Sequence, residues 1–398
     1  MKRILFLSII FSFVLEGCIF SNSNGDKEPN YVETTPDKVL PFKIRREKIN
    51  ARLSRVHLGN VRCLYRGIWG DKLAYTVIGR VEKRWKACYL DLNSLEEHIV
   101  PNEPGSYSAY GIYEDKILIA KEIKITKNKE WLWVFYLYDL KTGRKEWLFN
   151  KSINDEIPIA RFYGDKIAYF IGQSRARSSN DKRNEWDLMI YDINKREKKK
   201  ITTVDLARVY MEIVPLGIGL TSNMVAYMDN DKEHFRTNAK DPDLYVEEIK
   251  DYVSHASTYI GYYRFDDNKF YRVPMFGVGH PEASGDYILF DRINKDASKE
   301  LNVYNVKIQQ IISIVHKKFR YSFNDYDIND NRLVWVDPDT DEIHLYNLKN
   351  GSDKVLYKYK SAGSLFGVFG IAVSKKWLSI GVEYEDETVI DVYKLDEE

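Results

Sequence analysis

Few residues in this sequence have the types and spacing that catalysis or metal binding requires. The richest acidic string is Asp337-Pro338-Asp339-Thr340-Asp341-Glu342, whose alternating carboxylates could offer oxygen ligands to Ca²⁺. As an EF-hand loop the string fails, because Glu342 stands where the sharp turn needs glycine and Leu348 stands where a bidentate glutamate belongs. Asp and Pro are also turn formers, so a plain hairpin turn is the favoured interpretation. We expect no metal site and no cofactor.

The motifs of common hydrolases and nucleotide-binding proteins are absent. The sequence has no Gly-x-Ser-x-Gly elbow, no His-Glu-x-x-His, no cysteine pair at zinc-finger spacing and no phosphate-cradling glycine loop. Its 60 basic residues against 59 acidic ones give a formal net charge of +1, which creates no field to attract nucleic acid. These absences favour a binding protein over an enzyme, without a nucleic-acid partner.

The first eighteen residues have the pattern of an export signal. Lys2 and Arg3 precede a mostly apolar stretch, residues 4–15, which is too short for a membrane span of about 20 residues. The stretch ends in Leu15-Glu16-Gly17-Cys18, which resembles the lipobox of prokaryotic lipoproteins. The resemblance implies cleavage before Cys18 and lipid attachment to its sulfur. We therefore expect the protein on the outer face of the cytoplasmic membrane or on the cell surface, held by this lipid.

Three segments follow from this pattern: a signal peptide over residues 1–17, a flexible tether over 18–47, and a folded domain over 48–398. The two remaining cysteines, Cys63 and Cys88, fall on the first and third strands of one repeat. Two strand spacings separate them by about 9.6 Å, whereas a disulfide needs Cα atoms within about 7 Å. We expect free thiols.

An internal repeat determines the fold class. A turn followed by an apolar strand recurs seven times, at intervals of about 44 to 63 residues. The copies begin at Gly70-Asp71-Lys72, Glu114-Asp115-Lys116, Gly164-Asp165-Lys166, Ser222-Asn223-Met224, Gly285-Asp286-Tyr287, Asp330-Asn331-Arg332 and Lys375-Lys376-Trp377. A second strand motif, Tyr-x-apolar, follows six of them at Tyr138, Tyr191, Tyr263, Tyr304, Tyr346 and Tyr393, and Leu90-Asp91-Leu92 replaces it in the first repeat. With the strands before and after these motifs, each repeat has the four strands of a propeller blade.

The last repeat ends without a fourth strand, and a spare strand-like segment, residues 51–57, precedes the first repeat. The sequence therefore predicts an all-β, seven-bladed propeller closed by an N-terminal strand. The two repeat motifs resemble those of TolB-type, WD40-like propellers of bacterial and archaeal envelope proteins, over roughly residues 50–398. The resemblance implies the fold and, loosely, a protein-binding or scaffolding role. An abundance of Lys, Glu, Ile and Tyr suggests a thermophilic source, for which an archaeon is one candidate.

Three consecutive repeats carry long links between their second and third strands: Lys121–Trp131, Gly172–Trp186 and Asp229–Ser257. Links of this type emerge on one face of a propeller, so we expect them to form a binding face there. The first two links are rich in basic residues. The third predicts a short helix in blade 4, which Asp241-Pro242 starts and whose apolar stripe either docks on the propeller or meets a partner. The candidate residues of this face are Lys124, Lys127, Lys129, Arg175, Arg177, Lys182, Arg183, Tyr245, Ile249 and Tyr252.

Two functions remain open. The first is a monomeric scaffold that binds an envelope protein or an exported peptide. The second is a carbohydrate-binding or polysaccharide-processing propeller that uses the central channel. Trp131, Trp133 and Trp147 could line a sugar platform, although aromatic residues on strands more often pack between blades.

Overall fold

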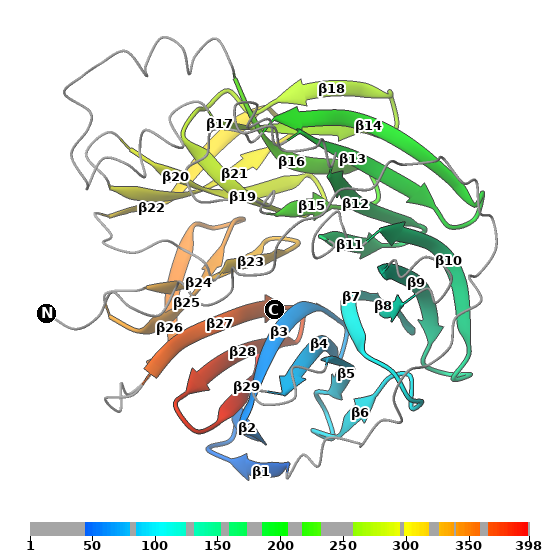
Figure 1. The fold of residues 1–398 in the computed structure, drawn as a ribbon. Coiled ribbons are helices and arrows are strands. Elements are labelled where there is room, and N and C mark those ends of the chain that lie inside the picture. Colours follow the sequence, from blue (N-terminus) through cyan, green and yellow to red (C-terminus); the bar gives the residue numbers. More distant parts are fainter. Residues whose placement is uncertain are drawn as a thin grey trace, which may run out of the picture.

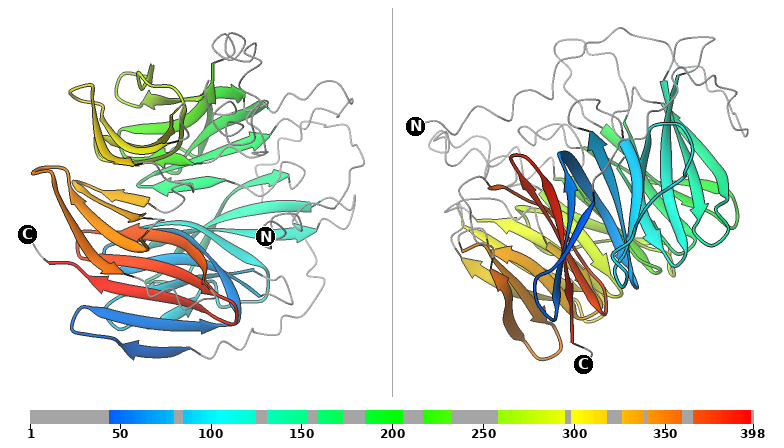
Figure 2. Two further views of the ribbon diagram at one scale, coloured as in Figure 1. Left: turned by 90° about the vertical axis from the view of Figure 1, so that its left-hand side faces the viewer. Right: turned by 90° about the horizontal axis from the view of Figure 1, so that it is seen from below.

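Seven antiparallel sheets make up the protein in a computed structural model. The structure describes residues 44–79, 85–124, 131–152, 159–172, 185–205, 217–231, 258–294, 298–317, 326–337, 340–358 and 365–396. The sheets fan out around one axis as the blades of a propeller (Figure 1). Seen from the side, the ring is a disc whose strands run between its two faces (Figure 2).

In each of the first six blades the four strands follow the chain from the axis outward. Blade 1 is β3 (Val61–Trp69), β4 (Lys72–Gly79), β5 (Trp85–Asp91) and β6 (Glu97–Ile99). Blade 2 is β7 (Tyr107–Tyr113), β8 (Lys116–Lys124), β9 (Trp131–Asp139) and β10 (Lys145–Ser152). Blade 3 is β11 (Ala160–Tyr163), β12 (Lys166–Gly172), β13 (Glu185–Asp192) and β14 (Glu197–Asp205).

Blade 4 is β15 (Ile218–Leu220), β16 (Met224–Asn230), β17 (Thr258–Arg264) and β18 (Lys269–Arg272). Blade 5 is β19 (Val278–Ser284), β20 (Tyr287–Ile293), β21 (Lys299–Asn305) and β22 (Gln310–Lys317). Blade 6 is β23 (Tyr326–Asn329), β24 (Arg332–Asp337), β25 (Glu342–Asn347) and β26 (Ser352–Lys358).

Blade 7 combines both ends of the described chain. Its inner strands are β27 (Leu365–Val373), β28 (Trp377–Tyr384) and β29 (Thr388–Lys394), and β2 (Leu53–Gly59) pairs antiparallel with β29. Most of the segment over residues 51–57, which was expected to complete the last repeat, belongs to β2. A fifth strand, β1 (Arg45–Lys48), pairs with β2 at the outer edge, within the range assigned to the tether. All four residues of β1 are exposed and charged, so they carry no apolar signal, and they keep this edge from pairing with other chains.

The repeated turn motif forms the hairpin between the first and second strands of each blade. In blade 3 the hairpin turns at Gly164, whose φ of 61° is in the left-handed region that glycine adopts without strain. The apolar residues after these turns pack between blades. One core cluster contains buried residues of blades 3, 4 and 5, including Leu188, Val225 and Phe290. Trp133 belongs to such a cluster, and Trp147 packs against another, so these two tryptophans serve the core; the side chain of Trp131 lies outside the description.

The described residues of the acidic string in blade 6 belong to the ends of two strands and to the turn at Thr340 and Asp341. β24 ends at Asp337 and β25 begins at Glu342, and the amide of Asp341 donates to the carbonyl of Asp337 at 2.9 Å. Cys63 and Cys88 are buried and form no disulfide, as predicted. The predicted helix of blade 4 lies outside the described residues, among which no helix occurs. Accordingly, the described part of the chain contains no helix long and apolar enough to cross a membrane.

Candidate binding site between blades 3 and 4

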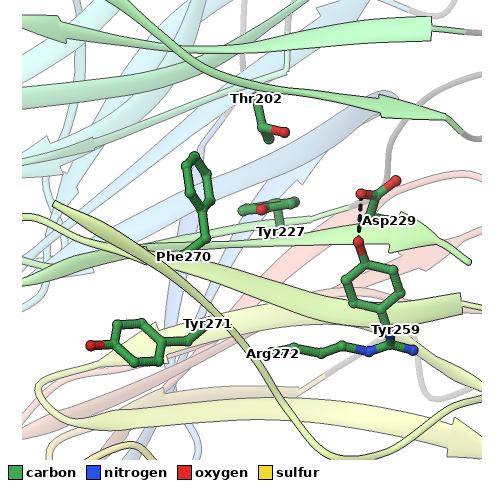
Figure 3. Close-up of a pocket in the computed structure, with 7 residues that line it drawn as sticks. All are labelled: Thr202, Tyr227, Asp229, Tyr259, Phe270, Tyr271 and Arg272. Atoms are coloured by element: carbon green, nitrogen blue, oxygen red, sulfur yellow. Dashed lines mark hydrogen bonds between the residues drawn. The ribbon is translucent and has the colours of Figure 1, made fainter.

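A pocket of about 380 Å³ lies where the outermost strand of blade 3 meets blade 4 (Figure 3). This volume is within the range of small-ligand sites. Its lining residues come from four strands and are mainly aromatic or charged: Thr202 of β14, Tyr227 and Asp229 of β16, Tyr259 of β17, and Phe270, Tyr271 and Arg272 of β18.

Strand alternation and register bring these side chains together. Tyr227 and Asp229 are two residues apart on β16, so they point to the same side of the sheet. Asp229 is paired with Tyr259 on β17, and Tyr227 is paired with Gly261. A Cβ on Gly261 would lie only 2.7 Å from the Tyr227 ring. Glycine is therefore needed at 261, because a larger residue would collide with the Tyr227 ring that lines the pocket.

Hydrogen bonds and ring contacts fix the polar groups. The Tyr259 hydroxyl donates to Asp229 Oδ2 at 2.8 Å (Figure 3). The Arg272 guanidinium lies 3.8 Å from the centre of the Tyr259 ring and 4.1 Å from that of Phe276, and its NH1 donates to Asp231 at 3.0 Å. Such stacking holds the guanidinium in one plane, so the Arg272 side chain loses less conformational entropy when a ligand binds.

The phenols of the buried Tyr227 and the partly buried Tyr259 keep their protons at neutral pH. Burial raises the pKa of Tyr227, and burial together with the negative charge of Asp229 raises the pKa of Tyr259. Phe270 differs from them because 52% of its side chain is exposed. The pocket thus offers an apolar ring, a guanidinium, a carboxylate and the Tyr227 phenol, a combination that recognises a partly apolar, partly polar ligand.

The predicted binding-face residues lie mostly outside the description. Lys124 is the last residue of β8, at the face from which the link to β9 leaves. The other candidates fall outside the described residues: Lys127, Lys129, Arg175, Arg177, Lys182, Arg183, Tyr245, Ile249 and Tyr252. Second and third strands of every blade meet at the face opposite the repeated hairpins, since neighbouring strands are antiparallel. The three long links therefore leave one face of consecutive blades 2, 3 and 4, near the pocket.

None of the seven lining residues was predicted from the sequence. The only local signal is the alternation of Tyr227 and Asp229 on one strand. The described residues also contain no group of three His, Cys, Asp or Glu side chains that could hold a metal ion.

Comparison with known proteins identifies the fold but no family. No protein-family model and no curated protein matches the chain. Among solved structures, an oligogalacturonate lyase in complex with manganese is 11% identical, with 90% of this chain and 97% of that chain covered and a TM-score of 0.55. The β-propeller domain of the Trilobed protease from Pyrococcus furiosus is 11% identical, with 85% and 98% covered and a TM-score of 0.53.

TolB from Acinetobacter baumannii is also a neighbour, at 12% identity, 72% and 64% coverage and a TM-score of 0.42, which is too distant to support an argument. At these identities the likenesses show the architecture alone. The chain is a seven-bladed β-propeller.

Proposed function

We propose that this propeller is a lipid-anchored protein of the cell envelope that binds another envelope protein or an exported peptide on blades 2 to 4. The pocket between blades 3 and 4 carries the proposal. It combines a half-exposed Phe270 with a stacked Arg272, and aromatic and arginine side chains contribute most of the binding energy in many protein interfaces. Three long links leave the same side of the ring, and loops raised from a rigid scaffold are common binding elements.

A photocrosslink at Phe270 tests the binding surface. We expect a p-benzoylphenylalanine at position 270 to give one discrete protein adduct on intact cells, since that ring would be covered by the partner. Val355, on the outermost strand of blade 6, is the matched control because its side chain is 48% exposed, against 52% for Phe270. Adding Arg272→Ala should lower the adduct yield at position 270 several-fold, because losing such an anchor costs about 2 kcal/mol. Equal adducts at 270 and 355 would remove the support for this surface.

The anchor is tested separately. We expect Cys18→Ser to move the protein from the membrane fraction to the soluble fraction, because buried acyl chains contribute about 0.8 kcal/mol per CH₂ to membrane attachment. The control is Cys63→Ala, which removes a buried thiol of the propeller and should leave the protein in the membrane fraction. A Cys18→Ser protein that stays with the membrane would show that something other than this lipid holds it.

A carbohydrate ligand is the second candidate function. The central channel was the expected place for such a ligand, but the pocket between blades 3 and 4 has side chains that suit a sugar. An exposed ring such as Phe270 can stack on a sugar, while Asp229 and Arg272 can accept and donate hydrogen bonds to its hydroxyls. Glycan-array binding that is lost in Arg272→Ala, without any protein adduct at position 270, would favour this candidate.

A further inference from the structure

The innermost strand of each blade ends at the repeated hairpin. Residues at the same distance from that hairpin occupy equivalent positions in the seven blades, and two such sets of positions form two layers around the axis. The layer at the hairpin end consists of Trp69, Tyr113, Tyr163, Thr221, Ser284, Asn329 and Ser374. The layer two residues further along consists of Gly67, Gly111, Arg161, Gly219, Glu282, Asp327 and Ala372. In this second layer only Arg161, Glu282 and Asp327 have side chains longer than a methyl group.

Two of the three charged side chains form an ion pair, and the third, Asp327, lies close enough to feel the charges of both. Arg161 of blade 3 donates through Nε to the carbonyl of Ile218 in blade 4, at 3.2 Å, and pairs through NH2 with Glu282 of blade 5. Asp327 of blade 6 accepts from the amides of Val373 at 2.7 Å and Ile328 at 2.8 Å. Water reaches this level of the axis, since the side chains of Arg161 and Glu282 are 31% and 26% exposed.

This layer has an excess of negative charge. One guanidinium stands against two carboxylates, so one negative charge remains when all three groups are ionised. Burial in the ring and the charge of Glu282 raise the pKa of Asp327 to about 7, because the two amide donors and Arg161 offset them only in part. The strand beside β23 presents Val334 opposite Asp327 and adds no charge.

Aromatic rings lie next to the charged layer, on the hairpin side. Trp69 and Tyr113 have ring centres 4.1 Å apart, and Tyr113 and Tyr163 have theirs 4.8 Å apart. On β11, Tyr163 is two residues from Arg161, so both side chains leave the strand on the same side. A ligand held by the carboxylates would therefore meet an apolar, electron-rich surface along the axis.

We propose that the axis at this level binds an alkylammonium group, with its charge against Asp327 and Glu282 and its hydrocarbon stem toward Trp69, Tyr113 and Tyr163. An ammonium has three donors for the carboxylate oxygens and needs fewer ligands than a metal ion. An anion is disfavoured because two carboxylates outnumber the one guanidinium of this layer, and Arg161 is itself paired with Glu282. The group can belong to a lysine side chain of a partner or to a free diamine. This site is separate from the pocket between blades 3 and 4, so it stands or fails independently of the proposed function.

Calorimetric titration of the mature protein with putrescine and with Nα-acetyl-lysine N-methylamide tests the site. Asp327 must be ionised to hold the cation, and both amines stay charged well above neutrality. We therefore expect affinity to rise roughly tenfold from about pH 6 to about pH 8, through the pKa of Asp327. Asp327→Asn should abolish this rise and weaken binding about tenfold at about pH 8. Arg161→Gln should strengthen binding, because it removes the competing cation.

The matched control is Asp386→Asn, the same substitution at an exposed carboxylate of blade 7, which should change nothing. Binding of only the lysine amide would assign the site to a partner's side chain, and binding of only putrescine would assign it to a free diamine. Affinity that stays flat with pH in the unmodified protein would overturn the proposal, and so would binding of neither amine. Binding of acetate that Arg161→Gln abolishes would show an anion site instead, which also overturns it. The pH series uses the unmodified protein, so it tests the proposal even if the Asp327→Asn variant fails to fold.

Discussion

Replacing Arg55 by leucine is expected to lower the free energy of unfolding by about 3 kcal/mol or more. Arg55 on β2 is paired in register with Asp391 on β29 and donates two hydrogen bonds to its carboxylate, at 2.6 and 2.8 Å. Asp391 is completely buried, so leucine at 55 would leave a buried charge without its partner. Urea unfolding followed by tryptophan fluorescence at neutral pH measures the effect.

The pH dependence of the Arg55→Leu variant adds a second readout. Burial raises the pKa of Asp391, and Arg55 opposes this rise. Without Arg55 the folded protein would hold the Asp391 proton more tightly, whereas the unfolded chain would not. The variant should therefore regain stability as pH falls toward the ordinary pKa of an aspartate and lose it as pH rises above that.

Two further variants make the result specific. Arg52→Ala breaks an ion pair with Asp396 whose side chains are 46% and 59% exposed, so water screens it and its loss should leave the stability almost unchanged. Combining Arg55→Leu with Asp391→Leu removes both charges and should recover most of the loss. An Arg55→Leu protein as stable as the parent would mean that the strand from the chain's start does not depend on this pair to hold the last blade.

Gly219→Ala is expected to destabilise the protein by about 2–3 kcal/mol, the second large effect. Gly219 is on the innermost strand of blade 4, and a Cβ there would lie 2.7 Å from the Cβ of Ala283 and 2.9 Å from its backbone nitrogen. The backbone of blade 5 cannot move away without disturbing its own sheet, so the inner strands of the two blades would be forced apart. The same urea experiment measures this change.

The control for Gly219 is another glycine with a different constraint. A Cβ on Gly164 would meet nothing within 4 Å, but its φ is 61°, so Gly164→Ala should cost only about 1 kcal/mol, through backbone strain. Ala283→Gly in the Gly219→Ala background should recover part of the loss, because it removes the nearest clashing atom. If Gly219→Ala costs no more than Gly164→Ala, the close approach of blades 4 and 5 is not a constraint on the fold.

The architecture could be predicted because each blade repeats the same local signals. Turn residues such as Gly164 and apolar runs such as the one after Lys166 fix a hairpin wherever they occur, and seven copies indicate a ring. β1 could not be predicted in the same way, since Arg45–Lys48 has no apolar residue and forms a strand only by extending the edge that β2 offers. The tertiary neighbour, rather than the local sequence, determines that strand.

The pocket and the axial layer could not be predicted for a different reason. Tyr259 and Asp229 meet only through the register of β16 with β17, across a link of more than twenty residues whose length gives no information about register. Arg161, Glu282 and Asp327 lie on three different blades. Their positions are recognised as equivalent only when the residues of each innermost strand are numbered from the hairpin of that blade. A one-residue change in that count would move each side chain to the other face of its strand.

The short fifth strand of blade 7 determines how the molecule responds to force. A load applied through residues before Ile44 would act first on Ile44, which packs against the core of blades 1 and 7. It would then act on β1, whose four pairs with β2 would open one after another, from Arg45–His57 to Lys48–Ser54. Sequential opening of this kind requires less force than shearing all the bonds at once. Because the residues of β1 are exposed and add nothing to the apolar core, β1 could detach while β2 remains paired with β29 and the ring stays closed. We therefore expect β1 to detach at a lower force than the force that unfolds any of the seven blades.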